Sequence, residues 1–101
     1  MNSFSMIFED RGSYPARCKV TFDSASEPSK SPMNCQLTGG QVKPLEGIPS
    51  DALNLIVEIQ LILGPLYRYE YATPSTELPR GKAKFDIYGL WPGPSRVEVT
   101  G

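Results

Sequence analysis

The sequence predicts an all-β chain that folds as one domain, residues 1–101, in an antiparallel β-sandwich of about seven strands. Apolar and polar residues alternate with a period of two in nearly every segment. Glycine and proline together account for 19 of the 101 residues and stand between these segments, where tight turns are expected. Helical spacing is nearly absent, and its best candidate, residues 50–55, is interpreted as a short turn at most.

Each alternating segment gives a strand with one apolar and one polar face, because successive side chains point to opposite sides. Such strands are typical of antiparallel sheets with one solvated side. The clearest case is residues 53–63, where every odd position is apolar, while Asn54, Glu58 and Gln60 occupy even positions. In chain order, the expected strands cover residues 4–8, 17–23, 34–37, 53–63, 67–71, 82–87 and 96–100.

The segments between the strands carry specific turn chemistry. Residues 63–66, Leu-Gly-Pro-Leu, predict a tight hairpin between the expected strands 53–63 and 67–71. Residues 91–94, Trp-Pro-Gly-Pro, fit a type II turn with Gly93 at the position that needs a positive φ. Residues 24–32 and 44–50 are expected to be loops. Two sheets that bury each other's apolar faces satisfy this pattern, and a small barrel is the main alternative.

The charge balance predicts no nucleic-acid partner and no anionic membrane surface. The chain has 10 basic and 11 acidic residues, a formal net charge of −1, whereas nucleic-acid binding usually needs a basic face. Residues 1–10 lack the features of a secretory signal, and no apolar run approaches the length of a membrane span. The expected location is therefore cytoplasmic by default, although a fragment of a secreted protein would also lack its signal.

The last third of the chain resembles the end of a carboxypeptidase-regulatory-like, transthyretin-type β-sandwich. The resemblance is carried by a glycine, a strand, a Gly-Leu-x-Pro-Gly turn over residues 89–93, and a valine-rich final strand with Val97 and Val99. Trp91 replaces the first proline of that family's turn, and Ser95 stands where the family has an aromatic residue. The resemblance implies a seven-stranded, immunoglobulin-like or transthyretin-like sandwich that serves as a binding module without catalytic residues.

The composition argues against an enzyme. The chain contains no histidine, which removes the commonest general base and metal ligand. The carboxylates Glu58, Glu70, Asp86 and Glu98 all fall on the outward face of their strands, where solvated charge is the ordinary interpretation. We therefore expect no catalytic residue, no cofactor and no metal site.

Cys18 and Cys35 are the most informative pair. If residues 17–23 and 34–37 form a symmetric hairpin, Cys18 faces Cys35 and Val20 faces Met33. Directly opposed residues have Cβ atoms roughly 4.5–5.5 Å apart, which is close to the separation that suits a disulfide. The two cysteines could form a bridge, but the lack of a secretory signal favours two reduced, buried thiols.

Aromatic residues are the candidates for ligand or partner contacts. Tyr67, Tyr69 and Tyr71 form a stripe on one strand face, which is either a binding platform or part of the core. Trp91 lies on a turn next to Tyr88, where it either contacts a partner or folds back to close the end of the sandwich.

Ile56 and Ile62 are apolar residues on an otherwise polar strand face, which either the loop 44–50 or a second subunit could cover, and they predict a homodimer contact. The leading hypothesis is a non-enzymatic module that binds an unidentified protein or carbohydrate. The alternatives are a small structural or oligomeric accessory protein, of the kind found in phages and mobile elements, and an inhibitor or immunity-type protein that adds an edge strand to its partner.

Overall fold

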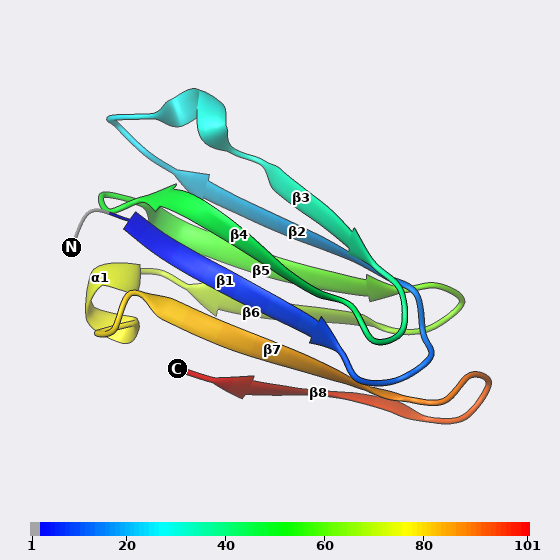
Figure 1. Ribbon diagram of the computed structural model, residues 1–101. Helices are drawn as coiled ribbons and strands as arrows, with labels where there is room; N and C mark the ends of the chain where they lie inside the picture. Colours follow the sequence, from blue (N-terminus) through cyan, green and yellow to red (C-terminus); the bar gives the residue numbers. More distant parts are fainter. Residues whose placement is uncertain (1–2) are drawn as a thin grey trace.

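A computed structural model describes residues 3–101 and shows two stacked four-stranded sheets. One sheet has the order β4-β1-β7-β8 and the other β3-β2-β5-β6. Figure 1 shows the two layers, with most strands running along the long dimension of the molecule. The strands are β1 (Ser3–Asp10), β2 (Ala16–Asp23), β3 (Met33–Leu37), β4 (Val42–Pro49), β5 (Leu53–Leu61), β6 (Leu66–Tyr71), β7 (Lys82–Gly89) and β8 (Ser95–Thr100). Two short helical turns, η1 (Pro28–Lys30) and α1 (Pro74–Glu77), lie in connections between strands.

The all-β sandwich is confirmed, with two corrections of detail. There are eight strands rather than seven, because residues 42–49 form β4 instead of a loop. Pro44 and Pro49 cannot donate to a ladder, but β4 is an edge strand, where proline is tolerated. The sheet is also not purely antiparallel, since β1 and β7 pair in parallel.

The core lies between the sheets and is built from the inward positions of each alternating segment. Phe8 stacks on Phe85 with ring centroids 5.2 Å apart, and Tyr69 of the facing sheet contacts the same Phe85 ring at 5.3 Å. The largest fully buried side chains are Phe4, Phe8, Phe85, Met6, Leu37, Ile48, Leu55, Ile59, Leu61, Leu78, Ile87 and Val20.

The alternation breaks at the start of β5. Leu53 was expected to point inward, but its side chain is 48% exposed while Ala52 is buried. The backbone of Asn54 has a φ of 52°, and the pairing of β2 with β5 shifts between Thr21 and Asp23. This bulge reverses the facing of Leu53, and the expected alternation resumes at Leu55.

Candidate functional site

Four loops gather at one end of the sandwich, which we call the loop end. They connect β1 to β2, β3 to β4, β5 to β6 and β7 to β8, and Figure 1 shows all four at the right of the molecule. The other connections, with both helical turns, lie at the opposite end, the far end. The two ends of the molecule are therefore built from different loops, and the exposed side chains of the two ends can be compared.

Exposed apolar side chains gather at the loop end. Of the eight large apolar side chains that are exposed among residues 3–101, six lie in or next to its loops. Leu63 is 81% exposed and Leu90 is 73% exposed, which makes them the two most exposed of the set. The sixth, Val42, lies at the start of β4, and we call the other five the apolar tip: Ile62, Leu63, Leu66, Leu90 and Trp91.

Tyr14 lies in the β1–β2 loop and contacts two of the other loops at this end, the β5–β6 and β7–β8 loops. Its buried ring packs edge-on against the Trp91 ring, with centroids 5.8 Å apart. Its hydroxyl donates to the carbonyl oxygen of Gly93, and its ring edge lies beside Gly64 of the β5–β6 loop. The exposed residues of the tip therefore rest on a buried aromatic support that fixes their relative positions.

The β7–β8 loop presents Trp91 outward. The backbone N–H of Trp91 donates to Ser13 Oγ at 2.8 Å, and the indole remains 52% exposed. The loop is closed by a hydrogen bond from the Gly93 N–H to the Leu90 carbonyl, with a cis bond between Trp91 and Pro92. The expected type II turn is therefore wrong, because Gly93 does not take the required positive φ and the turn is centred one residue earlier.

The β5–β6 loop presents Leu63, and the expected hairpin between these strands is confirmed. Leu63 has a φ of 55°, a left-handed conformation that is uncommon for a leucine. The side-chain amide of Gln60 donates to the carbonyls of Leu61 and Gly64 at 2.9 and 3.0 Å, which supports the loop. The Ile62 N–H donates to the Pro15 carbonyl and ties this loop to the β1–β2 loop.

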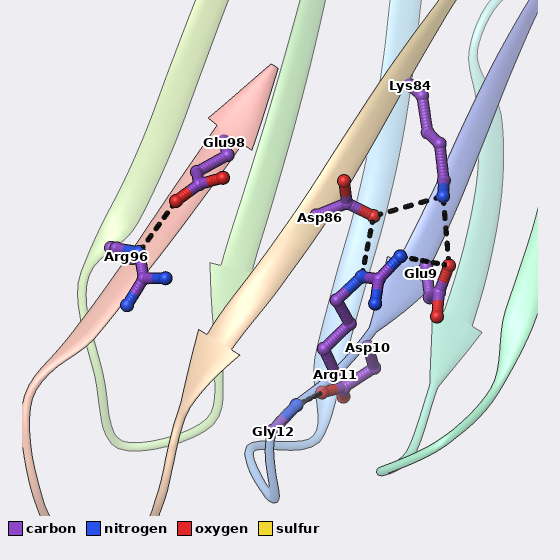
Figure 2. Close-up of polar contacts among 8 residues, drawn as sticks. All are labelled: Glu9, Asp10, Arg11, Gly12, Lys84, Asp86, Arg96 and Glu98. Carbon is purple, nitrogen blue, oxygen red and sulfur yellow. Dashed lines mark hydrogen bonds and ion pairs between the residues drawn. The ribbon is translucent and has the colours of Figure 1, made fainter. Parts of the chain in front are cut away.

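A ring of four charges lies on the outer face of the β4-β1-β7-β8 sheet (Figure 2). Arg11 Nε is 3.2 Å from Asp86 Oδ1, and its Nη2 is 3.3 Å from Glu9 Oε1. Lys84 Nζ contacts the same two carboxylates at 3.0 and 3.4 Å. Asp86 is thus on the outward face, as predicted, but Arg11 and Lys84 cover it.

The hydrogen bond to Asp86 raises the pKa of Arg11, and the hydrogen bond to Glu9 raises the pKa of Lys84. The ring is neutral as a whole and links the parallel strands β1 and β7.

Asp10 is a buried carboxylate that the sequence interpretation missed. It continues the inward register of Phe4, Met6 and Phe8, and its side chain has no exposure. Oδ1 accepts the Gly12 N–H at 3.2 Å, while Oδ2 has no hydrogen-bond partner among the described residues. Burial raises the pKa of Asp10, and the Gly12 hydrogen bond opposes this effect only in part.

The predicted facing of the cysteines is confirmed, since Cys18 pairs with Cys35 and Val20 with Met33 across β2 and β3. Both are free thiols in this structure, and Cys18 is the more buried. Hydrogen bonding to Cys35, with burial, raises the pKa of Cys18, whereas the same hydrogen bond and nearby Lys43 lower that of Cys35.

The tyrosines on β6 point toward the core. All three are half-buried and pack against the buried cluster, which favours the core interpretation over the binding platform. Burial raises the pKa of Tyr69 and of Tyr71. The Tyr67 hydroxyl lies 2.8 Å from Ser95 Oγ of the other sheet. The family that the last third of the chain resembles has an aromatic residue at the position of Ser95. In this structure, the aromatic ring beside that position is Tyr67 of the facing sheet.

The structure separates other residues that the sequence suggested as sites. Tyr88 is half-buried on an outer face, where the Arg96 guanidinium covers its ring at 4.1 Å from the centroid. Ile56 is half-buried in the middle of β5, whereas Ile62 is exposed in the loop beyond it. Six residues of extended chain separate the two isoleucines by roughly 20 Å. Homodimerisation stays a prediction.

Sequence reasoning missed Leu63, Leu90 and Tyr14. For Leu63 and Leu90, the sequence did contain a signal of exposure, because both leucines stand at turn positions, where polar residues are more usual. Within residues 3–101, no helix is long and apolar enough to cross a membrane, and no group of three acidic or cysteine side chains is placed to hold a metal ion.

Comparisons with known proteins place this fold among solved structures. The sequence matches no protein-family model and no curated protein. The chain is similar to the membrane-binding domain of pneumolysin, with a TM-score of 0.61 and 19% identity over 97% of this chain and 96% of that domain. A non-hemolytic pneumolysin from Streptococcus pneumoniae strain ST306 gives a TM-score of 0.64 at 21% identity over 96% of this chain. The human-specific toxin intermedilysin gives 0.55 at 9% identity over 97% of this chain. The chain spans 23% of each of these two longer proteins. At such identities the likeness shows a shared fold.

Proposed function

We propose that this chain is a non-enzymatic binding module whose apolar tip inserts into the interface of a lipid bilayer. The observation that carries the proposal is the exposure of Leu63 and Leu90, at 81% and 73%, on neighbouring loops at one end of the sandwich. Large apolar side chains that gather on a surface mark sites of association with proteins or membranes.

The geometry suits a bilayer interface. Trp91 combines a large apolar ring with one N–H group, and such rings are enriched where membrane meets water. Tyr14 and the hydrogen bonds around Gln60 hold the tip without needing the ligand. Because its loops are already ordered, binding would cost little conformational entropy.

The shared fold supports this proposal, since one of the similar structures is described as the membrane-binding domain of pneumolysin. The sequence interpretation considered only charge and spanning length when it predicted no membrane partner. Neither argument bears on shallow insertion, which needs only a few apolar side chains on a preformed end.

Vesicle cosedimentation of single-site variants tests the proposal. Leu63→Ser and Leu90→Ser should each weaken binding to phosphatidylcholine vesicles about tenfold or more, because burial of a leucine side chain contributes roughly 1.5–3 kcal/mol. Leu53→Ser is the control, since Leu53 is also an exposed leucine, at 48%, but lies at the far end. Equal effects of the three substitutions, or no binding by the unmodified chain, would contradict the proposal.

A carbohydrate ligand is the second candidate. One similar structure is described as the sugar-binding protein pneumolysin, and the exposed indole of Trp91 offers a stacking surface. Binding to a glycan array that is lost in Trp91→Ala but retained in Leu63→Ser would favour the sugar over the bilayer.

A further inference from the structure

A hollow that contains two basic residues lies directly beside the apolar tip. It has a volume of about 300 Å³ and opens between the starts of β2 and β4, and its apolar lining residues are Pro15, Ala16, Leu37 and Ile62 of the tip. Its charged lining residues are Arg17 and Lys43, and Gln36, Gln41 and Thr38 supply neutral polar groups. No aspartate or glutamate lines it among the described residues.

The two cations of this hollow have no carboxylate partner. Within residues 3–101, neither Arg17 nor Lys43 forms an ion pair, whereas Arg11, Arg68, Lys84 and Arg96 all do. Two unpaired cations in one hollow without acids form a local positive site on a chain whose net charge is −1. The site therefore suits an anion with several oxygen acceptors, which arginine recognises with paired N–H donors.

We propose that this hollow binds the phosphate-bearing headgroup of an anionic phospholipid while the neighbouring apolar tip inserts among the acyl chains. The proposal rests on the proposed function, because insertion of Ile62 and Leu63 brings the hollow to headgroup level. A lipid, rather than a free phosphate, is favoured because part of the lining is apolar and because Ile62 belongs both to this lining and to the exposed tip.

The expected size of the effect follows from electrostatics at a membrane surface. Each lysine or arginine near an anionic leaflet contributes about 1 kcal/mol, so loss of both should weaken binding roughly tenfold to thirtyfold. This preference should decline with added salt, since the Debye length is about 8 Å at physiological ionic strength. Binding to zwitterionic vesicles depends on the tip alone and should change little.

The test compares phosphatidylcholine vesicles with vesicles that also contain phosphatidylserine. The double variant Arg17→Gln/Lys43→Gln should lose the preference for phosphatidylserine and retain binding to phosphatidylcholine. Arg80→Gln/Lys82→Gln is the matched control, because both residues are exposed, lack an ion pair within residues 3–101 and flank the start of β7 at the far end. All four residues are exposed, and circular dichroism verifies that each variant is folded.

The outcomes separate this inference from the proposed function. Equal binding of the unmodified chain to both vesicles would overturn the headgroup site and leave tip insertion intact. Failure to bind either vesicle would overturn both. Equal loss of the preference in the far-end variant would overturn the assignment to this hollow. Saturable chemical-shift changes at Arg17 with inorganic phosphate, together with equal binding to both vesicles, would show a free-anion site instead of a lipid site.

Discussion

Cys18 and Cys35 face each other on neighbouring strands but differ in chemistry. Hydrogen bonding between the two thiols, with burial, raises the pKa of Cys18, whereas the same interaction and nearby Lys43 lower the pKa of Cys35, which is also the less buried of the two. The thiolate is the reactive form. We expect iodoacetamide to modify Cys35 at least about tenfold faster than Cys18, as measured by peptide mass spectrometry at pH 8. The Cys35→Ser variant should react with iodoacetamide only very slowly. Equal rates of modification at Cys18 and Cys35 in the folded protein would contradict the assignment of Cys35 as the reactive thiol.

Asp10 should make stability depend on pH in an unusual direction. Its pKa in the folded chain is raised by burial above the ordinary value of 3.8. The ionised form therefore destabilises the fold at neutral pH, and stability from this group increases as pH falls through the raised pKa. Asp10→Asn keeps an acceptor for the Gly12 N–H and removes the charge. Urea unfolding at pH 7 should show a gain of about 1 kcal/mol that shrinks toward pH 4.

Asp51 is the control for this prediction, because its pKa is lowered rather than raised. Hydrogen bonds from Ser24 and Ser26 lower its pKa. The stability that it contributes is present above the ordinary carboxyl pKa and is lost as pH falls through the lowered value. Asp51→Asn should therefore destabilise the fold at pH 7, with an effect that fades in acid. The same pH trend in both variants would sink the assignment of Asp10.

Glycines let three elements approach closely at the loop end. An added Cβ at Gly12 would collide with the carbonyl oxygen of Gly89 at the end of β7, and one at Gly39 would meet the Gly12 carbonyl at 2.7 Å. Backbone atoms cannot move aside as a flexible side chain can. We expect Gly12→Ala to lower the free energy of unfolding by about 1–3 kcal/mol, measured by urea denaturation. Ser50→Ala, in an exposed far-end turn, should stay within about 0.5 kcal/mol, and a neutral Gly12→Ala would show that the loops are not tightly packed.

At the scale of elements, the sequence predicted those strands whose side chains alternate cleanly. It placed β2 and β3 in register from the spacing of Cys18 and Cys35 alone, because a symmetric hairpin fixes every pair. It missed β4, since the prolines of that segment carry the signature of a loop, and their tolerance depends on an edge position that only the assembled sheet reveals. The parallel pairing of β1 and β7 is a property of topology that alternation does not encode.

At the scale of the whole molecule, the candidate site was only partly predictable. Trp91 was identified because a tryptophan on a turn is unusual in itself. The partners that make it a surface, Leu63 and Tyr14, come from other loops, and nothing local in the sequence shows that these loops share one end. Arg17 and Lys43 are 26 positions apart and line one hollow only because β3 and the β3–β4 loop return the chain beside β2. Sites assembled from several loops depend on topology in this way.

The shape of the molecule predicts how it should stand on a bilayer. Its extents are 42 × 24 × 20 Å, and the loop end and the far end lie at the two ends of the strands. If the apolar tip inserts, the molecule stands upright, and Ser50 in the far-end turn remains up to about 40 Å from the surface. Trp91 is the only tryptophan in the chain and serves as an energy donor at the loop end.

Energy transfer to vesicles with a dansyl-labelled headgroup measures this orientation. Transfer from Trp91 should be strong in the unmodified chain. In the double variant Trp91→Phe/Ser50→Trp, the donor moves to the far end while position 91 keeps an apolar ring, so transfer should fall to a small fraction of that value at equal amounts of bound protein. A molecule lying flat on the outer face of either sheet would hold both donors at similar heights, because its short dimensions are 24 and 20 Å. Equal transfer in the two proteins would therefore exclude insertion through the tip, and with it the arrangement that brings Arg17 and Lys43 to the headgroups.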